Sequence, residues 1–172
     1  MDAKISYYEV SPASAAEIRR SFASLGPVEG ERRWAAATDW KVTWKYQFDQ
    51  RAIAGCSVRT ASVHVDAVIT LPRWAPDESV DSSAVIWWQS FSAGLLEHER
   101  GHVLIALNEA RAIHEDMQHA SGGACEALAN ALNSIGQRHL SVLQATEAAY
   151  DRSTRHGATQ IDSIRATGFR RL

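Results

Sequence analysis

The sequence predicts a single α+β domain in which a small N-terminal sheet packs on a helical hairpin. Two observations predict this fold. Residues 1–75 contain segments in which apolar and polar residues alternate, whereas residues 82–150 carry apolar residues at helical spacing. The chain has 172 residues, of which 45% are hydrophobic, and this is enough for one core. The polar residues 151–172 are expected to form a less regular C-terminal tail.

The first expected elements are a short strand at Ile5–Val10 and a helix that ends near Leu25. Ser11 is a good N-cap and Pro12 is favoured at the first helical position, so together they predict where the helix begins. Gly26–Pro27 predicts its end, because glycine and proline commonly follow a helix.

Two longer strands are expected next. Apolar side chains alternate with polar ones over Trp40–Phe48, which is the period-two pattern of a strand with one buried face. The same pattern recurs over Ala61–Leu71. Pro72 is expected to end the hydrogen-bond ladder of this strand, because proline has no backbone N–H. Residues 73–81 then form a loop.

The second half of the chain predicts two helices joined by a turn. Residues 82–120 have helical spacing of apolar residues, with Gly94 as a point where the helix breaks or bends. Ser121–Gly123 is a turn, and Cys125–Tyr150 is the second helix. These two helices form the expected hairpin.

Composition excludes several classes of partner. The 18 basic and 20 acidic residues form no basic stripe with interleaved aromatics, so no nucleic-acid partner is expected. No apolar run reaches the roughly 18 residues of a membrane span. The first ten residues show no signal peptide, because they lack an apolar core behind a basic end. Cys56 and Cys125 are either a disulfide or two free thiols.

The chemistry of the chain is indicated by the run His98-Glu99-Arg100-Gly101-His102, an HExxH motif within the first long helix. Histidines four residues apart share one helix face, where they offer two corners of a tetrahedral zinc site. Glu99 is placed to act as general base toward a metal-bound water that attacks a peptide carbonyl. The motif predicts a Zn²⁺ cofactor and a peptide or protein substrate. A coincidental His and Glu on a metal-free helix is the simpler alternative.

A third protein ligand is expected from the second helix. Counting outward from the turn of the hairpin, His98 faces Glu147, which is the strongest ligand in that region. Asp151 lies one helical turn further and is expected to accept the second imidazole N–H of His98. His156 and Asp151 remain alternatives to Glu147 as the third ligand.

The motif followed by Glu147 and Asp151 resembles the gluzincin arrangement. There, a glutamate on a second helix completes the zinc site, and an aspartate four residues later supports a histidine. The whole chain also resembles a bacterial family catalogued as domain of unknown function 922 and described as candidate secreted zinc-dependent proteases. Besides the motif, the segments that carry this resemblance are Tyr7–Val10, Thr38–Trp44, Ile69–Trp74 and Tyr150–Gly157.

These resemblances imply a zincin-like fold, a peptidase-type zinc site, and export to the periplasm or the outside of the cell. By analogy with gluzincins, His156 or Tyr150 would steady the oxyanion that forms on the substrate. A turn that ends the helix is an equally good explanation of His156. The analogy also implies an edge strand that pairs with an extended substrate, for which Ala61–Leu71 is the candidate.

Three readings therefore stand: an active zinc peptidase, a zinc-containing peptidase-like protein that cleaves nothing, and a metal-free structural protein. The intact Glu99 favours the first, because a pure binding protein needs no general base. Gly101 costs about 1 kcal/mol within a helix relative to alanine, and we expect it to let a neighbouring backbone approach.

Overall fold

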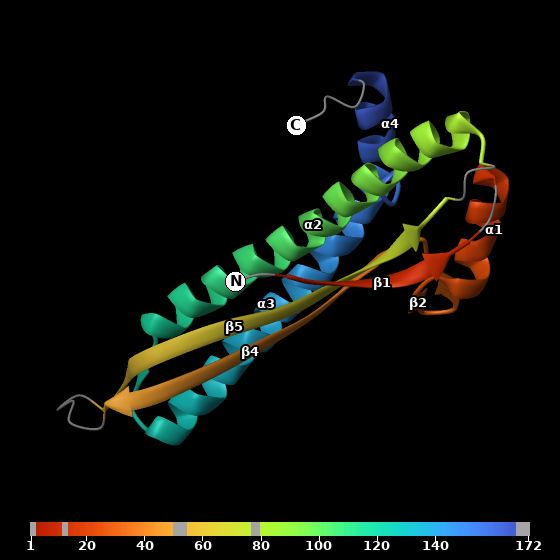
Figure 1. Ribbon diagram of the computed structural model, residues 1–172. Helices are drawn as coiled ribbons and strands as arrows, with labels where there is room; N and C mark the ends of the chain where they lie inside the picture. The colour runs from red at the N-terminus through yellow and green to blue at the C-terminus, as the bar shows by residue number, and fades with distance from the viewer. Residues whose placement is uncertain (1–2, 12–13, 50–54, 77–79, 168–172) are drawn as a thin grey trace. The chain divides into compact units, whose positions relative to one another are not determined.

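The computed structural model describes residues 3–11, 14–49, 55–76 and 80–167 (Figure 1). Over these residues the chain forms four helices, one small mixed sheet and a separate two-stranded ribbon, so the α+β prediction is confirmed. The strands are β1 (Lys4–Val10), β2 (Val28–Glu29), β3 (Arg32–Arg33), β4 (Ala37–Asp49), β5 (Cys56–Trp74) and β6 (Ser121–Gly122). The helices are α1 (Ala15–Leu25), α2 (Ser82–Gln118), α3 (Cys125–Thr154) and α4 (Ala158–Thr167).

The main sheet has the order β1-β5-β4, and β6 pairs with the start of β5. β1 runs parallel to the end of β5, with Lys4 opposite Val68 and Val10 opposite Trp74. The prediction that Pro72 ends β5 is wrong, since Pro72 pairs with Tyr8 and the strand continues to Trp74. Proline removes only one N–H donor, and the residues beside it still extend the ladder.

The position of β5 also corrects the expected substrate strand. Val68–Leu71, the last part of Ala61–Leu71, pairs with Lys4–Tyr7 and is therefore not a free edge. The outer strands in the sheet order are β1 and β4. Periodicity alone could not show this, because it identifies the buried face of a strand and not its neighbours.

The N-cap of α1 lies three residues later than predicted. Ser14 is the N-cap: its side-chain oxygen accepts the Glu17 N–H at 3.3 Å, and the Glu17 carboxylate accepts the Ser14 N–H at 3.1 Å. This capping box satisfies two donors at once, so it outcompetes the predicted cap at Ser11. Pro12 lies outside the described residues.

Two further expectations for the helices are corrected. α2 is continuous through Gly94, where a Cβ atom would lie 2.7 Å from the backbone of Ile161. This glycine therefore allows a close approach of α4 and does not break α2. The expected irregular tail is largely helical, since α3 extends to Thr154 and α4 follows. Residues 168–172 lie outside the described part.

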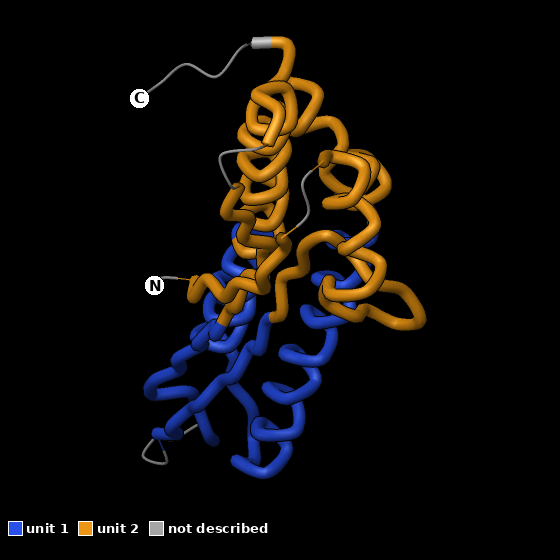
Figure 2. The backbone as a smooth tube through the Cα atoms, turned by 45° about the vertical axis from the view of Figure 1, so that its right-hand side comes forward, with its two compact units in different colours: residues 1, 40–66, 104–149 blue, residues 2–39, 67–103, 150–172 orange. Residues whose placement is uncertain are grey.

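The chain folds as two compact units (Figure 2). Unit 1 comprises residues 1, 40–66 and 104–149, and unit 2 comprises residues 2–39, 67–103 and 150–172. Both units draw on the first and second halves of the sequence, so neither corresponds to the strand-rich or the helical half. That the chain is one domain stays a prediction.

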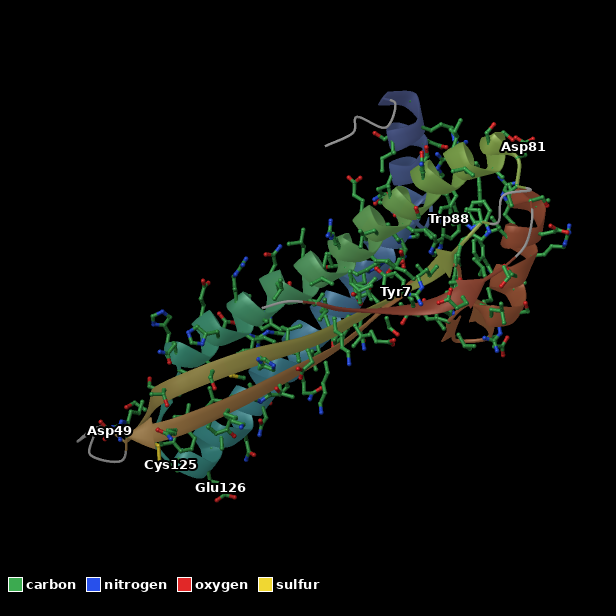
Figure 3. The ribbon with its side chains drawn as sticks, viewed as in Figure 1. Tyr7, Asp49, Asp81, Trp88, Cys125 and Glu126 are labelled. Carbon is green, nitrogen blue, oxygen red and sulfur yellow. A yellow bond between two sulfur atoms is a disulfide. The ribbon has the colours of Figure 1, made fainter. Side chains whose placement is uncertain are left out.

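Unit 1 contains a disulfide between Cys56 at the start of β5 and Cys125 at the start of α3 (Figure 3). Of the two alternatives for these cysteines, a disulfide and two free thiols, the structure therefore has the disulfide. Fully or almost fully buried side chains pack around it, namely Ile113, Met117, Leu128 and Leu132. By closing a long loop in the unfolded chain, such a bond stabilises a fold by roughly 4 kcal/mol.

Unit 2 is organised around aromatic side chains. Phe91 of α2 stacks on Phe22 of α1, with ring centroids 5.3 Å apart, and on Trp87 at 4.7 Å. A neighbouring buried cluster contains Ile69, Leu71 and Leu95. Since Leu95 lies one helical turn before His98, this cluster fixes the part of α2 that carries the motif.

None of the helices in the described ranges is both long and apolar enough to cross a membrane.

In unit 1, His139 of α3 is held between two carboxylates of α2. Its Nδ1 lies 2.8 Å from Glu109 Oε2, and its Nε2 lies 3.0 Å from Asp116 Oδ2, which Arg138 also contacts. Burial lowers the pKa of His139, but the hydrogen bonds and charges of Asp116 and Glu109 outweigh it, so the pKa is raised. The protonated imidazole is thus favoured in the folded state.

We predict that this clamp contributes less stability as the pH rises. The pKa of His139 in the folded state is above the ordinary value of about 6.5. The clamp therefore contributes fully to stability below about pH 6, and this contribution is lost as the pH rises past the raised pKa. Urea unfolding of the wild type and His139→Gln, at several pH values between about 5.5 and 9, should give a difference that shrinks with pH. A difference that stays constant would contradict the prediction, and His119→Gln at an exposed position is the control.

Candidate metal centre

The two motif histidines meet in the middle of α2. The imidazole Nε2 atoms of His98 and His102 are 3.3 Å apart, and the rings stand at 84° to each other. His98 is only 3% exposed. One helical turn separates the two residues, as the i, i+4 spacing predicts, and both ring nitrogens point to one place.

A third ligand-type atom lies at the same place. Asp151 Oδ1 is 3.2 Å from Nε2 of His98 and 3.2 Å from Nε2 of His102. Asp151 lies in the last turn of α3, and all three residues belong to unit 2. The three atoms form a nearly equilateral triangle, and these residues are a group that could hold a metal ion.

The triangle fits zinc in size and in chemistry. A zinc ion bound tetrahedrally with bonds of about 2.0–2.1 Å separates its ligand atoms by about 3.3–3.4 Å. The sides of 3.2–3.3 Å match this spacing. Two imidazoles and one carboxylate are also a three-ligand set of the kind that leaves a fourth position for water or substrate. Lone pairs converging on one point need a proton or a cation between them.

Burial prepares His98 for such a role. Removal from water lowers the pKa of His98 to about 4, and the positive charges of His102 and His156 act in the same direction, against the carboxylate of Asp151. His98 is therefore neutral near pH 7, and a neutral imidazole is the form that binds a metal.

Glu99 is buried and is held by a residue that the sequence analysis did not single out. Its side chain is 4% exposed, and Oε2 accepts a hydrogen bond of 2.7 Å from the Thr38 hydroxyl at the start of β4. Burial raises the pKa of Glu99, although the Thr38 bond opposes this effect. A threonine near a strand end carries no sequence signal for such a contact, because the partners are 61 residues apart.

Glu147, the third ligand predicted from the sequence, lies in unit 1, where its Oε1 accepts a 2.8 Å hydrogen bond from the Trp40 indole N–H. Its role as a ligand stays a prediction. Asp151, expected to accept the second imidazole N–H of His98, lies with Oδ1 3.2 Å from Nε2 of that ring, the nitrogen that also faces His102. The sequence places both carboxylates on one helix, but it cannot show which of them reaches the histidines.

Tyr150 packs against both motif histidines. Its ring stacks on that of His98, at 5.0 Å and 10°, and stands edge-on to His102, at 5.1 Å and 88°. Its hydroxyl donates to the His98 carbonyl at 3.2 Å and accepts from the Gln160 amide at 3.1 Å. This hydroxyl therefore holds the part of α2 that carries the two histidines, and its oxyanion role stays a prediction.

Gly101 makes room for this tyrosine. A Cβ atom at position 101 would lie 2.8 Å from Cε1 of Tyr150 and would overlap its Cζ and hydroxyl oxygen. The close neighbour expected from the sequence is therefore present, but it is a side chain and not a backbone.

His156 lies beside Asp151 at the end of an unusual turn. Its ring stacks on Trp34 with centroids 4.5 Å apart, and its Nδ1 lies 3.6 Å from Asp151 Oδ1. The φ angles of Arg155, His156 and Gly157 are 52°, 51° and 85°. A left-handed conformation costs a non-glycine residue roughly 1–2 kcal/mol, so the surrounding contacts must hold this turn.

The comparisons with known proteins place the chain in a family. Residues 5–157 match the family described as bacterial protein of unknown function (DUF922). The chain belongs to DUF922. The match covers most of the sequence, and within DUF922 the activity has not been assigned. No curated protein and no solved structure matches the chain. The family match includes all of the residues of the candidate metal centre in this DUF922 chain, from Thr38 to His156.

We predict that Gly101→Ala destabilises the protein. The methyl group would displace the Tyr150 ring, an overpacking cost of about 1–3 kcal/mol that exceeds the gain in helix propensity of at most about 1 kcal/mol. Urea unfolding measures the change in free energy. Gly123→Ala is the control, because a Cβ there has no neighbour within 4 Å. If Gly101→Ala is as stable as the wild type, Gly101 is not needed to make room for the Tyr150 ring.

Proposed function

We propose that this protein is a zinc-dependent peptide hydrolase, with zinc held by His98, His102 and Asp151 and with Glu99 as general base. The observation that supports this most is the triangle of ligand atoms with sides of 3.2–3.3 Å, formed by the two histidines of an HExxH motif and one carboxylate. This proposal takes Asp151 as the third ligand in place of Glu147, because Asp151 reaches both imidazoles.

The residues around the triangle suit hydrolysis. Zinc in this position would acidify a bound water and polarise a substrate carbonyl. Glu99 follows His98 in the helix, and the Thr38 hydroxyl orients its carboxylate to take the proton of the attacking water. The same carboxylate then delivers that proton to the leaving amine, so that the peptide bond breaks and Glu99 is regenerated.

Of the two candidates for the oxyanion, the structure favours His156. Its side chain is 49% exposed and lies beside Asp151, so a substrate can reach it. The Tyr150 hydroxyl already bonds to the His98 carbonyl and to Gln160. An imidazole N–H of His156 would donate a hydrogen bond to the oxyanion of the tetrahedral intermediate.

A second candidate is a zinc-containing protein of peptidase type that cleaves nothing. The burial of Glu99 favours it, because a carboxylate that is 4% exposed reaches water only if its surroundings open. We also propose that the protein is exported. The Cys56–Cys125 disulfide supports this, since such bonds persist in oxidising compartments.

We predict that the wild type binds about one zinc ion per chain and that Asp151→Asn weakens zinc binding by more than about 100-fold. Glu147→Gln should leave the affinity close to that of the wild type. The measurements are elemental mass spectrometry of protein purified without chelators, and competition with a zinc chelator. Loss of zinc in Glu147→Gln alone would return the third ligand to Glu147. A wild type without zinc would make the metal-free reading the leading one.

We predict that Glu99→Gln lowers peptide hydrolysis by about 10²–10⁴-fold while zinc remains bound, because only the proton transfer is lost. The assay is digestion of a broad peptide library, read by mass spectrometry. Glu97→Gln, at an exposed position two residues earlier, is the matched control and should cleave like the wild type. If the zinc-loaded wild type cleaves no peptide, the non-catalytic candidate replaces the hydrolase.

A further inference from the structure

The end of α3 encloses the imidazole of His98. Tyr150 stacks on one face of the ring, and a Cβ atom on Gly157 would lie 3.2 Å from its Cγ. Thr154 approaches from the side opposite the ligand triangle, with Oγ1 3.4 Å from Nδ1. Thr154 is 8% exposed and His98 is 3% exposed, so water does not compete strongly for this contact.

The hydrogen-bond directions around Thr154 follow from the distances. A hydroxyl has one proton and two lone pairs. Thr154 Oγ1 lies 2.8 Å from the Tyr150 carbonyl, which is the better acceptor distance, and 3.4 Å from both the Asp151 carbonyl and His98 Nδ1. The proton is therefore donated to the Tyr150 carbonyl, and a lone pair of Oγ1 faces Nδ1.

We propose that Thr154 selects the tautomer of His98 by accepting a hydrogen bond from its Nδ1–H. This inference rests on the proposed zinc site. A neutral imidazole carries one proton, so a proton at Nδ1 leaves the Nε2 lone pair toward His102 and Asp151, where the metal binds. Thr154 is a positioning residue, because it acts on the metal through His98.

Thr154 disfavours the other tautomer of His98, in which the proton is on Nε2. With its proton on Nε2, His98 would donate to Asp151 Oδ1 at 3.2 Å and block the ligand triangle. The Thr154 hydroxyl would then turn toward Nδ1 and give up its 2.8 Å bond to the Tyr150 carbonyl. The threonine thus makes the tautomer that cannot bind metal less favourable, and residues in such positions typically contribute 10–100-fold to metal affinity.

The test compares Thr154→Val, which keeps the shape and removes the acceptor, with Thr154→Ser, which keeps the acceptor. In competition with a zinc chelator, we expect Thr154→Val to bind zinc about 10–100-fold more weakly and Thr154→Ser to bind within about threefold of the wild type. Thr146→Val, at an exposed position on α3, is the matched control and should bind like the wild type. Thr154→Ala is measured alongside, so that an acceptor-free variant remains if valine prevents folding.

A second readout reports on the hydrogen bond itself. In the zinc-loaded protein labelled with ¹⁵N-histidine, the His98 Nδ1–H proton should exchange slowly in the wild type and in Thr154→Ser, and rapidly in Thr154→Val. Equal zinc affinity in the wild type and Thr154→Val would overturn the inference. So would equal losses in the valine and serine variants, which would indicate packing alone. A wild type that binds no zinc overturns the proposed function, and this inference with it.

Discussion

The convergence of two imidazole nitrogens and one carboxylate oxygen on a single point is the constraint on which unit 2 depends. His98 is buried, so its ring nitrogens must find partners within the protein, and the partly exposed carboxylate of Asp151 is one of them. The flat contact of Tyr150 on His98 and the missing side chain at Gly101 bring the end of α3 close enough for this. Without that approach, the two histidines of the HExxH motif would have no carboxylate beside them.

The arrangement also explains why unusual backbone occurs where it does. Two left-handed residues and a glycine separate α3 from α4, and they return the chain toward the ring of His98. The same turn places His156 between Trp34 and Asp151. Strain of this kind tends to be kept where it serves a site, and here His156 lies beside Asp151 and Gly157 lies against the ring of His98.

Burial within this site has two opposite consequences. It keeps His98 neutral, which suits a metal ligand, but it also raises the pKa of Glu99 and shields its carboxylate. The bond from Thr38 partly offsets the second effect. Whether the Glu99 carboxylate can reach a water molecule is therefore the property that distinguishes the two proposed functions, a zinc hydrolase and a zinc protein that does not cleave.

The sequence alone was enough to predict the α+β class, the three longer strands of the first half, the two long helices and the shared helix face of His98 and His102. These features depend on local periodicity and on spacing within one helix, which need no distant partner. Only the folded structure shows the disulfide, the central place of β5, and the contacts that Asp151, Thr38 and Thr154 make with the HExxH motif. Each of these joins residues from separate elements, and such contacts depend on how two helices and a sheet pack, which spacing along the chain does not encode.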